Sequence, residues 1–314
     1  MNSFGTLFRL TDFGETHGNC VGGIIDGCPA GIGIDEAFIK KELQRRSSGS
    51  SLSTQRKEKD DVRFVSGIYD GKSTGAPIAF LIDNTDAEPN LSSNYLLKPS
   101  HASYVLKEKY GHTCNEQGGR FAARQTVCRV VAGAVAKLVL RQRNITIDSE
   151  TLSVASIKKE GDTAGAVVQC RIANMPAGCG EPYYDGLDAR LAAAMLSIPA
   201  CKGFEIGEGF AAAKMCGSQY NDCQNPDFSF KSNHDGGVQS GISNGQPIIF
   251  RVAFKPIPTV RFPQQTIDYE GNVITYTGNN RNDIAVVPRV LPVVEAMAAM
   301  VAVDALLIAG GIKC

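Results

Sequence analysis

The sequence predicts an α+β protein made of two related halves. Residues 14–33 and 161–180 align without a gap at an offset of 147, and nine of the twenty positions are identical. A second similarity aligns residues 66–71 with 240–245 and residues 77–80 with 247–250, with a shorter turn in the second copy. In both halves a glycine-rich strand pair, a helix and another strand region follow in the same order. We therefore expect one domain over residues 1–314, duplicated internally into about 1–145 and 146–314 around a pseudo-twofold axis.

The first copy of the repeat predicts a strand, a helix and a second strand. Residues 21–25 and 78–82 are rich in the branched side chains that favour strands. Between them, residues 35–46 place Ile39 and Leu43 four positions apart, which is typical of one helix face. The second copy repeats this order with strands at 167–172 and 248–254 and a helix at 187–196.

Two longer helices follow from apolar periodicity. Residues 121–143 predict a helix opened by Gly118 and Gly119, with its apolar positions turned toward a core. Residues 290–309 are apolar but carry Glu295 and Asp304, so we expect a buried helix rather than a membrane span. Polar segments at 85–94 and 221–237 predict surface turns.

Composition limits the classes of function. The chain has 32 Lys and Arg against 32 Asp and Glu, so its formal net charge is zero, which argues against a nucleic-acid binder. An anionic ligand would therefore be held by a local cluster of cations. The ten cysteines form no CxxC motif, and no apolar leader opens the chain, so we expect a cytoplasmic protein with reduced thiols.

Two of the four histidines are candidates for chemistry. His17 lies in a glycine-bounded loop, and its counterpart in the repeat is Ala164, so the fold does not require an imidazole there. That difference favours a functional role over a structural one. His101 lies in an irregular segment and, taken alone, is as consistent with a structural role as with a functional one.

Several cations lie beside these loops. Arg45 and Arg46 end the first helix, and Arg120 and Arg124 are four apart at the expected start of the long helix, so they would share a face. The helix start also offers free amide groups and the positive end of its dipole, which suits a phosphate. Either arginine pair alone would more simply be a solvated charged face. Lys255 and Arg281 are similar candidates.

Over nearly its whole length the chain resembles the chorismate synthase family. The resemblance rests on ordered phrases along the chain: 13–18 (FGETHG), 26–31, Arg45-Arg46, 54–58 (TQRKE), His101-Ala102, 109–111 (KYG), 180–182 (GEP), 197–207 (SIPACKGFEIG), 241–245 (GISNG), Lys255-Pro256, Arg281, Asp283 and 287–289 (VPR).

The resemblance implies a fold and an activity. The implied fold is a β-α-β sandwich of two pseudo-symmetric halves, assembled as a homotetramer. The implied reaction converts 5-enolpyruvylshikimate 3-phosphate to chorismate and phosphate, a step of the shikimate pathway of aromatic amino acid biosynthesis. It is an anti 1,4-elimination that needs reduced FMN, with NADPH as one source of its electrons. No nucleic acid or membrane partner and no metal ion is expected.

The resemblance also assigns roles to residues. His17 would protonate the leaving phosphate, His101 would protonate or stabilise the reduced flavin near N1, and Asp283 would assist proton removal together with flavin N5. Substrate or NADP binding would fall to Arg45, Arg46 and Arg124. The flavin would be bound by Arg120, Phe121, Ala122, Pro199, Ala200, Ser240, Lys255, Pro256, Ile257, Pro258, Thr259 and Arg281.

The chain departs from the family pattern near the expected flavin site. Phe121 and Ala122 replace two serines, Gln125 replaces a glutamate, and Asn282 replaces a histidine. Two hypotheses follow. The first is a working chorismate synthase, favoured by His17, His101 and Asp283. The second is a degenerate paralogue that binds flavin or an anionic metabolite without turnover.

Overall fold

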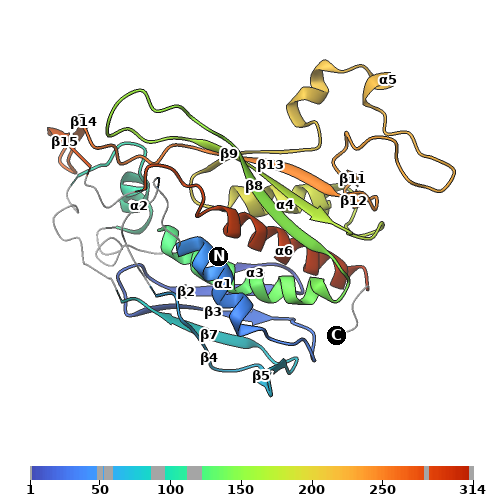
Figure 1. Cartoon of the computed structure of the whole chain (residues 1–314). Helices are drawn as coiled ribbons and strands as arrows, with labels where there is room; N and C mark the ends of the chain where they lie inside the picture. The colour runs from blue at the N-terminus through green and yellow to red at the C-terminus, as the bar shows by residue number, and fades with distance from the viewer. Residues whose placement is uncertain are drawn as a thin grey trace.

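Two antiparallel sheets enclose a layer of helices, as Figure 1 shows for the computed structural model of the chain. The structure describes residues 2–47, 52, 59–85, 96–111, 122–278 and 283–310. The first sheet has the order β1 (Ser3–Phe4), β2 (Arg9–Gly14), β3 (Cys20–Asp26), β7 (Ile78–Asp83) and β4 (Val62–Phe64). The second has the order β10 (Cys201–Ile206), β13 (Ile248–Phe254), β9 (Ala166–Ala173) and β8 (Thr146–Val154). The predicted β-α-β sandwich is confirmed.

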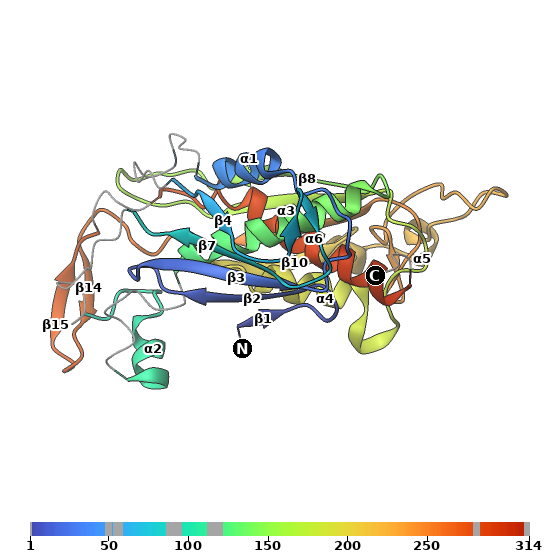
Figure 2. The same ribbon diagram turned by 90° about the horizontal axis from the view of Figure 1, so that it is seen from below.

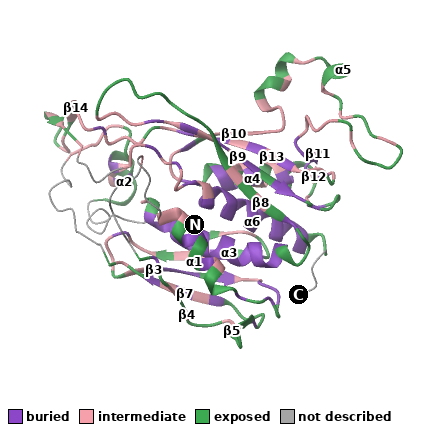
Figure 3. Ribbon diagram, in the orientation of Figure 1, coloured by how far each residue is buried: buried purple, intermediate pink, exposed green. Residues whose placement is uncertain are grey.

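The middle layer is built on two buried helices, α3 (Thr126–Arg141) and α6 (Leu291–Ile308), with α1 (Glu36–Ser47) and α4 (Leu187–Leu196) beside them (Figure 3). α3 and α6 meet at Gly133, where an added Cβ would lie only 2.2 Å from the Cβ of Ala296. Among the described residues, α6 is the one helix long and apolar enough to span a membrane, and 89% of it is buried inside the protein. The prediction of a buried C-terminal helix is confirmed.

Small hairpins and short helices lie at the two ends of the sandwich. Residues beyond the sheets form the hairpins β5 (Ile68–Tyr69) with β6 (Lys72–Ser73), β11 (Val238–Gln239) with β12 (Ile242–Ser243), and β14 (Gln264–Ile267) with β15 (Val273–Tyr276). The helix α2 (Ser103–Tyr110) lies near β14 and β15 in both ribbon views, and α5 (Gly217–Tyr220) lies at the opposite end (Figures 1 and 2).

The duplication appears in the register of the two sheets. Ile25 pairs with Ile78 in β3 and β7, and Ile172 pairs with Ile248 in β9 and β13, so equivalent residues face each other. The strand orders also correspond, since β4-β7-β3-β2 in one sheet matches β10-β13-β9-β8 in the other. The prediction that segments 14–84 and 161–254 share one strand order is confirmed.

The structure supports the second similarity between the halves but corrects the alignment of its first part. Ser73 Oγ donates to Pro29 O and accepts from Ile32 N, and Ser243 Oγ makes the same two bonds with Pro176 O and Cys179 N. Ser73 therefore corresponds to Ser243, and residues 66–71 correspond to 236–241 rather than 240–245. No shorter turn exists in the second copy. The recurrence of Ser-Gly-Ile four residues later produced the false match, because tight turns reuse the same small residues.

The long helix begins later than predicted. Ala122 is extended, residues Ala123–Gln125 form a 3₁₀ turn, and the α-helix starts only at Thr126. Arg124 therefore lies in the turn before α3 rather than in the α-helix itself, and the expectation that it shares a helix face with Arg120 involves a residue that is not described. Arg120 itself lies outside the described residues.

An ionic cluster is buried where α1, α3, α6 and β8 meet. Lys137 Nζ donates to the carboxylates of Glu42 and Glu295, at 2.6 Å from Glu295 Oε2. Arg45 binds Glu295 with two hydrogen bonds of 2.6 Å, and Ser149 Oγ donates to the same carboxylate at 2.7 Å. Burial opposes ionisation of Glu295, but its bonds to Arg45 and the charge of Lys137 outweigh burial and lower its pKa. The two cations thus balance the two carboxylates inside the helix layer.

Lys137→Met should destabilise the fold by about 3–5 kcal/mol, because it leaves two buried carboxylates with a single cation. Chemical denaturation would measure this loss. The control is Lys40→Met, which removes an exposed ion pair with Asp61 and should change stability by less than about 1 kcal/mol. Equal effects in the two variants would contradict a charge-balancing role for Lys137.

Candidate active site

The predicted site residues gather mainly at one end of the sandwich. The turn between β2 and β3, the helix α2 and the hairpin β14–β15 all lie at this end, in both ribbon views (Figures 1 and 2). The buried helices α3 and α6 both begin toward this end. The positive ends of two helix dipoles therefore face the same region, which favours anions there.

His17 lies half-buried in the tight turn that joins β2 to β3. Gly14 enters the turn at φ +93°, and an added Cβ would meet Cys20 O at 2.4 Å. Gly18 N donates to Glu15 O at 3.1 Å and closes the turn. Glycine is needed at the entrance because other residues rarely adopt this backbone conformation and have no room here.

Side-chain amides hold this turn from outside. Asn84 Nδ2, just after β7, donates to Glu15 O at 2.9 Å and to Gly18 O at 2.7 Å. Gln125 Nε2, from the 3₁₀ turn before α3, donates to Gly14 O. Three carbonyl groups around His17 are thus bound by two side chains from different elements.

Beside the turn, Asp60 lies between two arginines. Its carboxylate accepts from Arg46 Nη2 at 2.7 Å and from Arg124 Nη1. The side chains are only 2%, 12% and 4% exposed for Asp60, Arg46 and Arg124 respectively, so solvent screens the charges weakly. Burial works against the charged carboxylate, but the two guanidinium groups outweigh it and hold the pKa of Asp60 below its usual range. The cluster keeps a net positive charge.

Arg124 connects the two parts of this region. Its Nε donates to Asn84 Oδ1 at 2.9 Å, so the side chain that holds the His17 turn also orients the arginine. Three buried polar atoms around these groups have no hydrogen-bond partner among the described residues, namely Thr16 Oγ1, Arg46 Nε and Gln125 Oε1. Such atoms are costly to leave unpaired, and they can accept or donate to a bound ligand.

The structure separates Arg45 from Arg46. The guanidinium of Arg45 binds Glu295 and Glu42 in the buried cluster described above, whereas that of Arg46 binds Asp60. Neighbouring residues on a helix point about 100° apart, so the two side chains reach different sides of α1.

His101 lies in a second basic group. Lys255 Nζ donates to Ser100 O at 2.7 Å, and Ser100 adopts φ +54° directly before the histidine. His101 is an exposed residue, yet the pKa of its ring is lowered, first by desolvation and then by the charges of Lys98 and Lys255. The neutral ring is therefore favoured near neutral pH.

Most of the described residues expected at the flavin lie around Lys255. Lys255 N donates to Ala200 O at 2.9 Å, which joins the segment after β13 to the turn after Pro199. Ile257 O accepts from Thr163 Oγ1 at 2.6 Å. Pro256, Pro258 and Thr259 belong to the same segment, which leads into the hairpin β14–β15.

Asp283 lies beside the second copy of the His17 turn. Ala164, the counterpart of His17, donates its N–H to Ile284 O at 2.9 Å. The carboxylate of Asp283 faces Arg289, with Nε 3.7 Å from Oδ1. Leu52 O accepts from Ile284 N at 2.8 Å, which ties this segment to the chain after α1.

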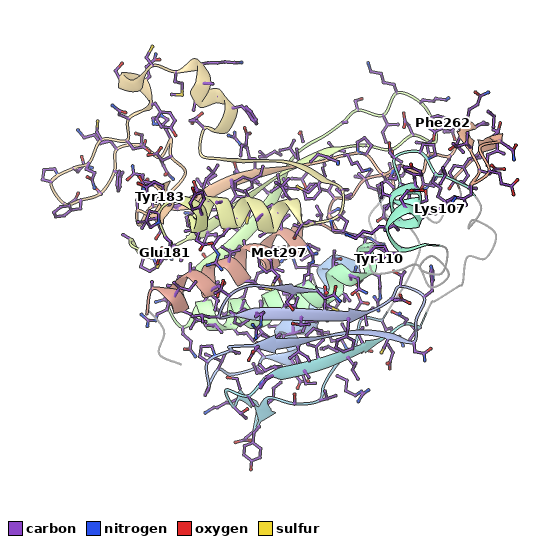
Figure 4. The ribbon with its side chains drawn as sticks, turned by 180° about the vertical axis from the view of Figure 1, so that it is seen from behind. Lys107, Tyr110, Glu181, Tyr183, Phe262 and Met297 are labelled. Atoms are coloured by element: carbon purple, nitrogen blue, oxygen red, sulfur yellow. The ribbon has the colours of Figure 1, made fainter. Side chains whose placement is uncertain are left out.

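Ser240 lies away from the other site residues. It connects β11 to β12, and the neighbouring Gly241 packs on Glu181. Figure 4 shows Glu181 and Tyr183 at the end of the molecule opposite Lys107 and Tyr110 of α2, with Met297 of α6 between the two ends. Within one chain, Ser240 therefore does not join the group. Arg120, Phe121 and Arg281 lie outside the described residues. Of the arginines expected at the substrate and flavin sites, Arg46 and Arg124 are seen to come together, on Asp60.

Sequence reasoning missed Asp60 and Asn84. Asp60 follows a charged run, in which a buried carboxylate has no distinguishing pattern, and Asn84 directly precedes the segment 85–94 that is predicted to form a surface turn. The one available signal was the position of Asn84 directly after an apolar strand, at the end where β3 begins.

Comparisons with known proteins agree over nearly the full length. Residues 8–159 and 152–307 each match the family model described as chorismate synthase. Relatives with that name include proteins of Christiangramia forsetii (45% identical, 96% of each chain covered) and Bacteroides thetaiotaomicron (46% identical, 96% of this chain and 97% of the relative). The protein of Porphyromonas gingivalis is 44% identical, with 100% of this chain and 98% of the relative covered.

A solved structure has the same fold. The structure titled "Crystal Structure of Chorismate Synthase" matches with a TM-score of 0.75 and 29% sequence identity, covering 97% of this chain and 93% of that chain. The two chains can thus be superposed over nearly their full lengths. The chain belongs to the chorismate synthase family, whose members are lyases of aromatic biosynthesis.

Proposed function

We propose that this protein is a working chorismate synthase. It converts 5-enolpyruvylshikimate 3-phosphate to chorismate and phosphate by an anti 1,4-elimination that requires reduced FMN. The observation that carries the proposal is the buried Arg46–Asp60–Arg124 cluster directly beside the turn of His17. Cations next to a histidine suit a reaction in which an anionic group leaves and takes up a proton.

The charge of the site matches a substrate with a phosphate and two carboxylates. Arg46 and Arg124 can each bind an oxyanion with more than one N–H, and burial strengthens these bonds. Asp60 orients both guanidinium groups without cancelling their joint charge. The unpaired atoms Thr16 Oγ1 and Arg46 Nε supply a hydroxyl and a further donor for the same ligand.

His17 acts on the leaving group in this proposal. Its imidazolium donates a proton to the bridging oxygen of the phosphate as the C–O bond breaks, and the product phosphate carries that proton away. Asp283 assists removal of the substrate proton whose C–H bond breaks in the same overall reaction. Arg46 and Arg124 stabilise the negative charge that develops on the leaving group.

The residues around Lys255 fit a reduced flavin. An anionic ring system and a phosphate tail need cations, and Lys98 and Lys255 supply two beside His101. The neutral imidazole of His101 can donate or accept a hydrogen bond at the flavin. Pro199, Ala200 and residues 256–259 lie around Lys255 in the proposed flavin region. Ala122 lies at the start of the turn before α3. When bound, reduced FMN supplies electron density to the substrate.

The proposal includes an assembly and a compartment. We infer a cytoplasmic homotetramer in which Ser240 reaches a flavin site of another copy, because it lies at the far end of its own chain. NADPH is the proposed source of electrons for the flavin. A paralogue without turnover has no comparison in its favour, and Phe121 and Ala122 are its remaining argument.

His17→Ala should lower kcat by about 10²–10⁴-fold, because a general acid contributes that much. The assay uses photoreduced FMN and the phosphorylated substrate without oxygen and follows the absorbance of chorismate. The control is Arg9→Gln, which removes an exposed ion pair with Asp26 at the end of β2 away from His17 and should keep the activity of the unchanged protein. Flavin binding without any chorismate from the unchanged protein would instead support the paralogue.

Ala122→Ser should tighten FMN binding by up to about tenfold, since a neutral hydrogen bond contributes roughly 0.5–1.5 kcal/mol. Turnover at saturating flavin should change little, because His17, His101 and Asp283 are untouched. FMN affinity would be measured anaerobically in both proteins. Unchanged affinity would mean that a serine hydroxyl finds no flavin partner at this position.

Lys255→Met should raise the pKa of His101 toward its ordinary value, because one of the two positive charges that oppose protonation is removed. An NMR titration of the histidine ring protons would show the shift. Burial and Lys98 remain, so the pKa stays below the usual range. A lowered pKa would show that Lys255 does not act on His101 through its charge.

A further inference from the structure

We propose that Asn84 and Gln125 are positioning residues that fix the turn of His17, and that Asn84 couples this turn to Arg124. The inference rests on the proposed function, since it assigns to both amides the placing of the proton donor. Both amides lie at the ends of elements rather than inside the sheet, Asn84 directly after β7 and Gln125 in the 3₁₀ turn before α3.

The hydrogen bonds fix the orientation of both amides. The carbonyls of Gly14, Glu15 and Gly18 can only accept, so each must receive an amide N–H. Arg124 Nε can only donate, so it must meet Asn84 Oδ1. Asn84 therefore uses both amide protons and its oxygen at once, and an isosteric carboxylate could keep only the bond to Arg124.

The turn has few other restraints within the described residues. Its short backbone bonds run from Gly18 N to Glu15 O and from Asn84 N to Asn19 O. The two amides bind carbonyls on both sides of His17, so losing them frees the peptide groups that determine where the imidazole points. A displacement of about 1 Å can cost roughly 10²-fold in rate.

The link to Arg124 makes anion binding and proton donation interdependent. Arg124 is held by Asp60 through Nη1 and by Asn84 through Nε, so a movement of its guanidinium is transmitted to the carbonyls of the turn. The position of a phosphate bound by Arg124 would thus be fixed relative to that of His17. Asn84 acts here through other groups and need not touch the substrate.

Asn84→Asp removes both donors to the turn. The aspartate keeps an acceptor for Arg124 Nε but places oxygen against Glu15 O and Gly18 O. We expect kcat to fall by about 10–100-fold, and KM to rise as well, because the new carboxylate offsets the charge of Arg124. Asn84→Ala, which also removes the acceptor for Arg124, should lower kcat similarly and raise KM. Gln125→Met removes only the bond to Gly14 O and changes no charge, so it should lower kcat with KM changed less than about threefold, and it gives a second test if the Asn84 variants fail to fold.

Hydrogen exchange provides a readout that does not depend on turnover. Amides of residues 15–19 should exchange faster in Asn84→Asp, while those of α3 and α6 stay unchanged. The matched control is Asn233→Asp, which loses a comparable amide bond to Pro247 O of 2.9 Å in the segment before β11 and should leave exchange at residues 15–19 unchanged.

Each outcome bears on the proposal. Unchanged exchange at 15–19 in a folded Asn84→Asp protein, or a KM that rises while kcat is kept, would overturn it. If exchange is faster in Asn84→Asp but the unchanged protein makes no chorismate, the positioning role of the two amides stands and the proposed function is refuted. The failure of the inference and the failure of the proposed function can thus be told apart.

Discussion

The close contact of α3 with α6 is the constraint on which the rest of the structure depends. Gly133 lets the backbone of α3 approach Ala296 closely, and no other residue would fit there. Both sheets then pack on opposite sides of one thin helix layer. Because both helices begin toward the same end, their positive dipole ends point toward the end of the sandwich that holds the β2–β3 turn and the 3₁₀ turn before α3.

Duplication supplied two equivalent turns, and the two have acquired different tasks. The first carries His17 and is bound by amides and by the arginine cluster. In the second, Thr163 Oγ1 binds Ile257 O and Ala164 N binds Ile284 O, so this turn supports the segments of Lys255 and Asp283. One pseudo-symmetric framework thereby holds the proposed acid on one side and the proposed cofactor segment on the other.

The neutral overall charge conceals an uneven internal distribution. In the helix layer, Arg45 and Lys137 are balanced by Glu42 and Glu295, which makes that cluster a structural element. At the site, Asp60 balances only one of two arginines, and the remaining charge is available to an anion. Arg45 belongs to the structural cluster, whereas its neighbour Arg46 belongs to the cluster at the site.

The amino-acid pattern was sufficient for the strands, the helices and the family, because apolar periodicity and rare motifs are local properties of the chain. The same pattern indicated a functional role for His17, since Ala164 occupies the equivalent position in the second copy of the repeat. It could not show that Arg45 turns to Glu295, that Asp60 joins two arginines, or that Asn84 holds the His17 turn. These contacts join residues 14 to 250 positions apart, and their partners are chosen by packing. A polar side chain outside a periodic element carries no sign of its partner until the fold brings the two together and burial makes an unpaired group costly.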